Sequence, residues 1–180
     1  MENLKKTISN INSLWNDLNT EFIIENILVD INNNRLDIEA KIDSIPNKFG
    51  IYIFFIKPKS SYSNIDDLSK DWVLNEFKNY PKIIKKRFES NSKQGNWHVF
   101  YIGKSEKIKT RISEHLTHHK NHATYGLKLS ERTNFKSKNE IHVGYWIFPD
   151  EKISNEVKQF FITNLERLLR EKLNPWIGKQ

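Results

Sequence analysis

Residues 50–56 read Gly-Ile-Tyr-Ile-Phe-Phe-Ile, and residues 97–103 read Trp-His-Val-Phe-Tyr-Ile-Gly. Both runs are rich in β-branched and aromatic residues. Lys57-Pro58 closes the first run and Gly103 closes the second, as is typical of buried strands. Each run also pairs a tyrosine with a glycine, at Tyr52 and at Tyr101. The two runs therefore predict the first two core strands of a sheet.

The chain beyond Gly103 alternates helical and strand-like patterns. Ser105 can cap a helix whose apolar stripe includes Ile108 and Ile112, and Asn174-Pro175 ends a second, strongly amphipathic helix. We predict helices over residues 105 to about 116 or 119 and over residues 154–173, with further strands over residues 124–129 and 141–148. This order predicts an α+β fold with a small, mainly antiparallel sheet flanked by helices.

Two segments surround the first strand. Residues 1–46 carry apolar residues at helical spacing, so we interpret them as an N-terminal helical arm that covers one face of the sheet. Residues 47–180 then form the main domain. An insertion at about residues 58–96 separates the two core strands, and we predict helical pieces in it over residues 67–77 and 82–88.

Composition narrows the classes of partner and compartment. The chain has 180 residues, no cysteine, a net charge of +7 and a sequence pI near 9.4. This charge favours an acidic partner such as nucleic acid or an anionic membrane. Disulfides and cysteine-ligated zinc are excluded, and no apolar run is long enough to span a membrane. The N-terminus lacks the apolar core of a signal peptide, so we expect a cytoplasmic protein.

Polar residues after the second strand form the candidate site. Lys104 lies three residues after Tyr101, and Arg111 and His115 project from one face of the predicted helix because they are four residues apart. Glu166 lies at the edge of the apolar stripe of the last predicted helix. An arginine fork matches phosphate oxygens, a histidine can orient water or shuttle a proton, and a lone carboxylate suits a hard cation.

These residues and strands together resemble the GIY-YIG nuclease superfamily, which includes nucleases of DNA repair, homing and restriction. The resemblance covers residues 50–177, with both signature strands, the Arg/His helix and the Glu helix in the same order. It implies a metal-dependent endonuclease that hydrolyses DNA phosphodiester bonds with one Mg²⁺ or Mn²⁺ ion. The catalytic residues would be Tyr52, Tyr101, Lys104, Arg111, His115 and Glu166, with Glu166 as the metal ligand.

One of the two tyrosines would act as the general base. A tyrosine hydroxyl has an ordinary pKa of about 10, so positive charge must lie nearby if it is to accept a proton at neutral pH. We favour Tyr101 over Tyr52 because Lys104 follows it so closely.

Two features depart from the family pattern. About forty residues separate the signature strands where many relatives have a short hairpin, which exceeds ordinary connection lengths. Relatives also carry an asparagine shortly after the proline that ends the Glu helix, and here that place is Gly178. Either Asn174 or another residue substitutes, or the site is weakened. A catalytically silent nucleic-acid-binding module that keeps the fold is therefore the alternative function.

Ordinary explanations exist for each residue taken alone. The tyrosines can be core residues with bonded hydroxyls, and Glu166 can pair with Arg170 one turn along the helix. A histidine cluster around His115 raises the alternative of a zinc site, although zinc usually takes four ligands. We favour a role in contacting DNA phosphates for the basic residues near this cluster and in the insertion, which are Lys107, Lys109, Lys120, Lys85, Lys86 and Arg87.

Overall fold

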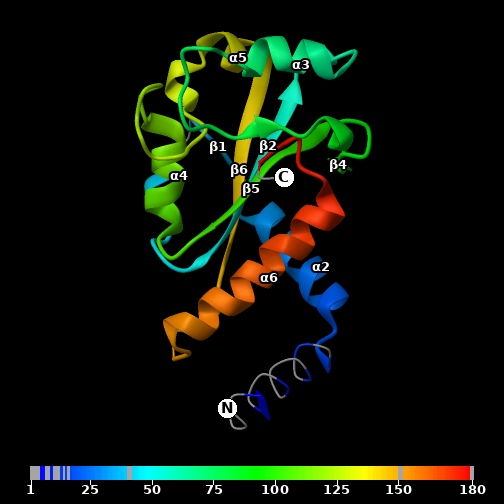
Figure 1. The fold of residues 1–180 in the computed structure, drawn as a ribbon, viewed down its shortest axis with the longest axis vertical. Coiled ribbons are helices and arrows are strands. Elements are labelled where there is room, and N and C mark those ends of the chain that lie inside the picture. Colours follow the sequence, from blue (N-terminus) through cyan, green and yellow to red (C-terminus); the bar gives the residue numbers. More distant parts are fainter. Residues whose placement is uncertain are drawn as a thin grey trace.

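A computed structural model describes residues 5, 6, 9, 13, 15, 17–39, 42–149 and 152–178. It shows an α+β fold in which helices pack on both faces of an antiparallel sheet (Figure 1). The five strands follow the order β1-β6-β2-β5-β4, with bounds β1 Leu36–Asp37, β2 Gly50–Pro58, β4 Lys93–Gln94, β5 Trp97–Ser105 and β6 Asn139–Ile147. Strands β3 (Lys82–Ile83) and β7 (Ile177–Gly178) form a separate two-stranded ribbon.

The helices connect and cover these strands. The α-helices are α2 Thr20–Asn33, α3 Ile65–Trp72, α4 Ile108–Thr117, α5 Thr133–Lys138 and α6 Asn155–Leu173. Three short 3-10 helices, η1 Ile42–Ser44, η2 Lys85–Arg87 and η3 Leu129–Glu131, lie in the connections. None of the helices in the described ranges is long and apolar enough to cross a membrane.

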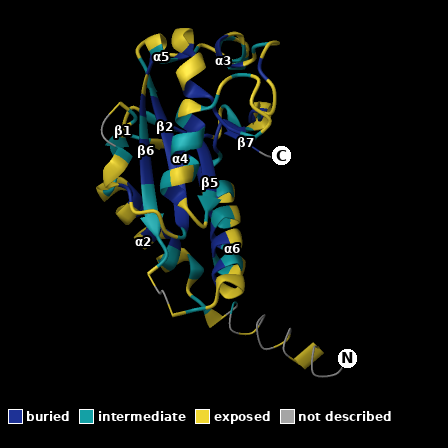
Figure 2. Cartoon of the chain, turned by 90° about the vertical axis from the view of Figure 1, so that its left-hand side faces the viewer, coloured by how far each residue is buried: buried dark blue, intermediate teal, exposed yellow. Residues whose placement is uncertain are grey.

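Strand β2 is the centre of the fold, because it pairs with β5 along one edge and with β6 along the other. Residues 50–56 are all buried, so the strand is covered on both faces, as its uninterrupted apolar run predicts. Tyr52 and Phe54 face a core shared with α3, α4 and α5, whereas Ile51 and Ile53 face a core shared with α2 and α6. Figure 2 shows the strands of the sheet in the buried colour and the helices α4 and α6 as partly exposed.

The N-terminal segment contributes both a helix and a strand. Asn19 caps α2 by accepting a hydrogen bond from the backbone N–H of Phe22, and the buried side of α2 packs on the sheet as expected for a covering helix. Its close approach needs a glycine, because a Cβ at Gly144 of β6 would lie 2.4 Å from the carbonyl oxygen of Ile31. Strand β1 then pairs with β6, so residues 36 and 37 belong to the same sheet as β2. The remaining part of the predicted arm lies largely outside the described residues.

The predicted helices of the insertion were partly wrong. The helix expected over residues 67–77 is α3, which ends at Trp72. Residues 82–88, expected to be helical, instead form β3 and η2. The cause is tertiary, because Lys82 pairs with Gly178 and the N–H of Ile84 donates to the carbonyl of Trp176. These contacts use backbone groups that a helix would need for itself.

The strand expected over residues 124–129 is also wrong. This segment belongs to an irregular loop, the 118–128 loop, which leads from α4 to η3. The N–H of Leu127 donates to the ring of His115, and Lys128 has a left-handed backbone with φ of 56°, so strand pairing is interrupted. Helix α5 follows and was not predicted.

Several local predictions were correct. Strands β2, β5 and β6 lie where their apolar runs placed them, and α6 begins after Ser154, whose hydroxyl accepts a hydrogen bond from the N–H of Val157. Helix α4 begins later than expected, at Ile108. The hydroxyl of Ser105 accepts from the N–H of Lys107 just ahead of this helix.

We expect Gly144→Ala to lower the free energy of unfolding by about 1–3 kcal/mol, because the new methyl group forces α2 away from β6. Urea denaturation measures the change. Glu140→Ala on the same strand is the control, and its loss of an exposed ion pair with Lys57 changes the free energy by less than about 1 kcal/mol. An unchanged unfolding midpoint in Gly144→Ala would show that α2 does not approach the strand in this way.

Candidate active site

A cavity of about 440 Å³ lies where β5, α4 and α6 meet. It brings together five of the six residues expected to be catalytic, drawn from four different elements. Its lining is Tyr52, Tyr101, Gly103, Lys104, Arg111, Tyr125, Glu166 and Arg170. The sixth expected residue, His115, is fully buried behind Tyr52 and does not line the cavity.

His115 connects the cavity wall to the 118–128 loop. Its Nδ1 accepts a hydrogen bond of 3.0 Å from the backbone N–H of Leu127, and its Nε2 lies 2.8 Å from the hydroxyl of Tyr52. Burial, followed by the positive charge of Arg111, holds the pKa of His115 well below its ordinary value, so the ring is neutral. Since Nδ1 is the acceptor, Nε2 carries the proton and donates it to the oxygen of Tyr52.

The glycine of the second signature strand makes room for Tyr52. Tyr52 and Gly103 are partners across β2 and β5, and the ring of Tyr52 crosses over Gly103. A Cβ at Gly103 would lie 2.4 Å from the Tyr52 hydroxyl oxygen. A side chain at this position would push the hydroxyl away from His115, so the close approach explains why this tyrosine and this glycine occur together.

The two signature tyrosines differ in their electrostatic surroundings. Burial and the neighbouring Tyr101 raise the pKa of Tyr52 well above its ordinary value. Burial also raises the pKa of Tyr101, but the charges of Arg170 and Arg111 and a hydrogen bond from Tyr52 act in the opposite direction. Arg111 also acts to lower the pKa of Tyr52, so the difference between the two hydroxyls is that Arg170 acts on Tyr101 as well.

Arg111 has two roles in the geometry. One end of its guanidinium donates to Glu114 at 2.5 Å, and the other donates to the backbone carbonyl of Tyr125 at 2.6 Å. The side chain thus holds the 118–128 loop against α4 while its charge acts on the tyrosines of the cavity.

Lys104 lies in the cavity wall, where its ammonium bonds to α6. Its ammonium donates to the hydroxyl of Thr163 at 2.6 Å and to Gln159 at 3.3 Å, both on α6. The cations that lower the pKa of Tyr101 are Arg170 and Arg111. Lys104 lines the cavity and ties the end of β5 to α6.

Glu166 forms an ion pair with Arg170, which lies one turn further along α6. Arg170, one turn along α6, donates to the Glu166 carboxylate at 2.9 Å and to the carbonyl of Ile102 at 2.9 Å. The Glu166 carboxylate is mostly buried and lines the cavity. A single carboxylate that faces a cavity is compatible with Mg²⁺, which keeps several waters and binds substrate phosphate as well.

The alternative zinc site gains no support from the geometry. Both ring nitrogens of His115 are in hydrogen bonds, and the rings of His118 and His122 stack on each other with centroids 3.9 Å apart. Across the described ranges, no group of three or more His, Asp or Glu side chains is placed to hold a metal ion.

The basic residues expected to contact DNA lie in two places. Near α4, Lys107 is exposed, Lys109 pairs with Asp43 at 3.2 Å, and Lys120 pairs with Glu76 at 2.6 Å. The second group, Lys85, Lys86 and Arg87, makes up η2. The two lysines of η2 are exposed, whereas Arg87 is half-buried.

Neither Asn174 nor Gly178 is among the residues that line the cavity. Asn174 ends α6 with a left-handed backbone, and its side chain donates to the carbonyl of Ser90. Gly178 pairs with Lys82 in the β3–β7 ribbon and is buried. Both positions therefore hold the insertion against the end of α6.

Tyr125 and Arg170 belong to the cavity but were not predicted as site residues. For Arg170, the spacing of four residues from Glu166 predicted the ion pair between them, but it did not predict that Arg170 lines the cavity. For Tyr125, nothing in the sequence indicated a place in the site. It lies on the 118–128 loop, whose conformation depends on tertiary contacts. Lys128 donates to three carbonyls in and near this loop, and Arg132 donates to the carbonyls of Leu127 and Trp72.

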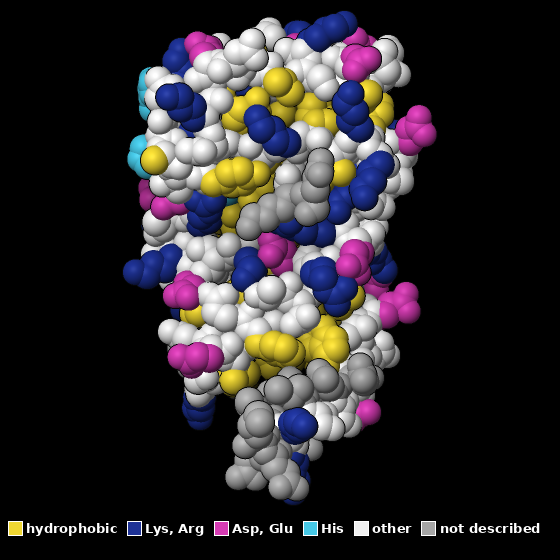
Figure 3. All heavy atoms as spheres, viewed as in Figure 1, with side chains coloured by type: hydrophobic (Ala, Val, Ile, Leu, Met, Phe, Trp, Pro, Cys, Tyr) yellow, Lys and Arg dark blue, Asp and Glu magenta, His cyan; other side chains and the backbone are white. Residues whose placement is uncertain are grey.

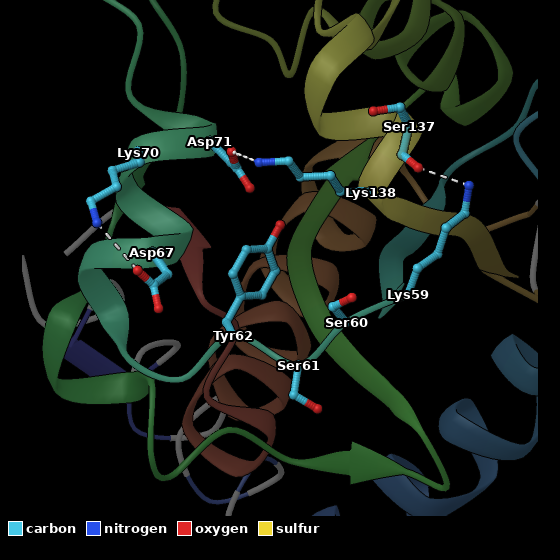
Figure 4. A pocket seen from close by; sticks show the side chains of 9 residues that line it. All are labelled: Lys59, Ser60, Ser61, Tyr62, Asp67, Lys70, Asp71, Ser137 and Lys138. Carbon is cyan, nitrogen blue, oxygen red and sulfur yellow. Dashed lines mark hydrogen bonds and ion pairs between the residues drawn. The ribbon is translucent and has the colours of Figure 1, made fainter.

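A second hollow, of about 570 Å³, lies near the far end of β2 between α3 and α5 (Figure 4). Its charged side chains already have partners. Lys138 pairs with Asp71 at 2.6 Å, Lys70 pairs with Asp67, and the ammonium of Lys59 donates to the carbonyl of Ser137. The charged side chains that line this hollow are therefore all engaged within the protein.

Comparison of the chain with family models, with curated proteins and with solved structures finds no match.

The buried neutral histidine predicts a specific pH dependence. Because the pKa of His115 is depressed in the folded chain, the unfolded chain binds more protons below about pH 6.5, and stability falls as pH falls through that value. The loss from His115 alone approaches about 1.4 kcal/mol per pH unit.

We expect His115→Gln to be less stable than the wild type at neutral pH but to lose less stability per pH unit on acidification. Urea unfolding at several pH values measures both slopes. His119→Gln, at a position that is 60% exposed, should keep the wild-type slope. Equal slopes in all three proteins would mean that His115 is not neutral and buried in the folded chain.

Proposed function

We propose that this protein is a metal-dependent endonuclease of the GIY-YIG type that hydrolyses DNA phosphodiester bonds. The observation that carries the proposal is the single cavity in which Tyr52, Tyr101, Arg111 and Glu166 converge from separate elements. The resemblance selected these residues by sequence alone, and they lie far apart in the chain. Their convergence supports a common chemical role more than four unrelated structural roles.

The residues fit the needs of phosphodiester hydrolysis. Tyr101 acts as the general base, since two arginines favour the charged form of its hydroxyl and Tyr52 donates a hydrogen bond to it. Arg111 faces the charge that gathers on the phosphate during the reaction. Tyr52 and His115 act as positioning residues, because the His115 proton fixes the Tyr52 hydroxyl that contacts Tyr101.

Glu166 would hold the metal ion, because it is the acidic residue that lines the cavity. A bound Mg²⁺ or Mn²⁺ supplies charge stabilisation at the phosphate and at the leaving oxygen. Arg170 pairs with the same carboxylate at 2.9 Å, so a bound metal ion would share Glu166 with Arg170.

The alternative is a DNA-binding module that keeps the fold without cleaving. Two observations favour it. Gly178 stands where relatives carry an asparagine, and the Glu166 carboxylate is already paired with Arg170. The two functions differ in one measurable property, which is the production of nicks.

We expect purified protein to nick supercoiled plasmid with Mg²⁺ or Mn²⁺, and Glu166→Ala to abolish nicking. DNA affinity in metal-free buffer should stay within a few-fold, since the metal serves the chemical step. Glu156→Ala, which removes an exposed carboxylate from the first turn of the same helix, is the control and should cut normally. Binding without nicking in the wild type would favour the silent module, and full activity in Glu166→Ala would remove the residue from the site.

We expect Tyr101→Phe to lower the single-turnover rate at least a hundredfold, which is typical for loss of a general base, with little change in stability. Tyr52→Phe should keep more of the rate but lower stability, because it leaves the His115 proton without its acceptor. Tyr145→Phe on the adjacent strand should match the wild type. If Tyr52→Phe loses the rate and Tyr101→Phe keeps it, the two roles are reversed.

The single-turnover rate measured against pH distinguishes the effect of Arg170 on Tyr101 from that of Lys104. Arg170→Gln should move the activity optimum to higher pH, because the pKa of Tyr101 rises when this charge is removed. Lys104→Met should leave the optimum in place, since its ammonium contacts α6. A shift in Lys104→Met alone would return Lys104 to the role that its sequence position first suggested.

A further inference from the structure

The insertion and the C-terminal end of α6 are tightly joined. The N–H of Ile84 donates to the carbonyl of Trp176 at 2.9 Å, and the N–H of Ser92 donates to the carbonyl of Leu173 at 3.0 Å. The ring of Phe88 stacks on Trp176 with centroids 5.1 Å apart. These contacts on either side of η2 place this basic 3-10 helix beside the last turns of α6, where Arg170 lies.

Two arginines at this junction have buried N–H groups without acceptors. Arg170 uses one end of its guanidinium for Glu166 and Ile102, but its Nε is buried without a hydrogen-bond partner. The Nη1 of Arg87 is buried and unpaired in the same way. Leaving a buried charged donor unpaired costs about 1–3 kcal/mol or more, and both side chains are partly exposed, so an acceptor that approached either guanidinium from outside would be favourable.

The two guanidinium groups also repel each other. Burial lowers the pKa of Arg87, and the charge of Arg170 lowers it further. Glu171 lies close enough to oppose this effect, but its carboxylate is bonded to Arg167 at 2.8 Å. An anion between the two arginines would relieve the repulsion and accept hydrogen bonds from both, and the planar guanidinium fork suits phosphate oxygens.

We propose that Arg87 and Arg170 form a second phosphate subsite that holds a phosphodiester next to the one in the cavity. This inference rests on the proposed function, because it concerns the path of the same DNA strand. Arg111 and Arg170 both act on Tyr101 in the cavity, and Arg87 is close enough to Arg170 for the two charges to interact. The strand therefore leaves the cavity over the end of α6 and passes along η2.

The surface agrees with this path. Figure 3, drawn in the same view as Figure 1, shows Lys and Arg side chains gathered where α6 ends. The exposed Lys85 and Lys86 continue the basic surface along η2. The subsite gives the insertion a role in aligning substrate, since η2 is part of the insertion.

The first test measures binding of a defined DNA duplex and of its single strand in metal-free buffer over a range of salt concentrations. We expect Arg87→Gln to weaken binding roughly tenfold and to lower the salt dependence by about one ionic contact. Arg87→Lys should recover only part of the affinity, because lysine lacks the fork. Arg167→Gln removes the same charge from an exposed position on α6 and should bind as the wild type does.

The second test replaces single phosphates of the DNA with neutral methylphosphonates around the position of tightest contact. A methylphosphonate at one phosphate next to the one in the cavity should weaken binding of the DNA to the wild-type protein. The same replacement should not weaken its binding to Arg87→Gln any further. The subsite does not exist if the affinity lost through the methylphosphonate and the affinity lost through Arg87→Gln add at every position of the DNA. It also does not exist if Arg87→Gln binds DNA as well as Arg167→Gln does. Neither readout needs cleavage, so absence of nicking with both results intact would overturn the nuclease and leave the subsite standing.

Discussion

The hydrogen bond between His115 and Tyr52 is the interaction on which the rest of the site depends. It joins α4 to the central strand, and the second nitrogen of the same ring fixes the 118–128 loop through Leu127. It forms inside the protein, where an unpaired partner costs far more than in water. The glycine at position 103 is required by the same contact, because the Tyr52 ring occupies the space of a side chain there. Tyr101, Arg111 and Tyr125 all take their places around this fixed point.

The sequence was informative where local pattern and tertiary structure agree. Residues 50–56 of β2 and 99–103 of β5 are apolar runs that are buried on both faces, and α6 has a serine cap and a regular stripe. The two tyrosines, Arg111 and Glu166 were predicted from their order and spacing to share one site, and they line the same cavity. Tyr125 could not be placed, since only contacts with Arg111 and His115 bring the 118–128 loop to the cavity. Likewise, nothing in the local sequence shows that residues on either side of η2 bond to Leu173 and Trp176 at the end of α6.

Two buried cations explain how so irregular a loop is held in one conformation. Lys128 donates to the carbonyls of Lys78, Lys120 and His122, and Arg132 stacks on Trp72 and Phe77. Burial lowers the pKa of both groups, and that of Arg132 to about 10. The net charge of +7 counts these two side chains although they satisfy backbone oxygens of the protein itself. Composition therefore overstates the charge that is available to a partner.

The central place of β2 also constrains the order in which the chain can fold. This strand has no neighbour close to it in sequence, because β5 begins at Trp97 and β6 only at Asn139. Contacts between distant segments form slowly, since a long loop must close before they contribute any stability. During synthesis an apolar strand with two open edges must wait until most of the chain has been made. The polar insertion that follows β2 is therefore synthesised while both edges of this apolar strand are still open.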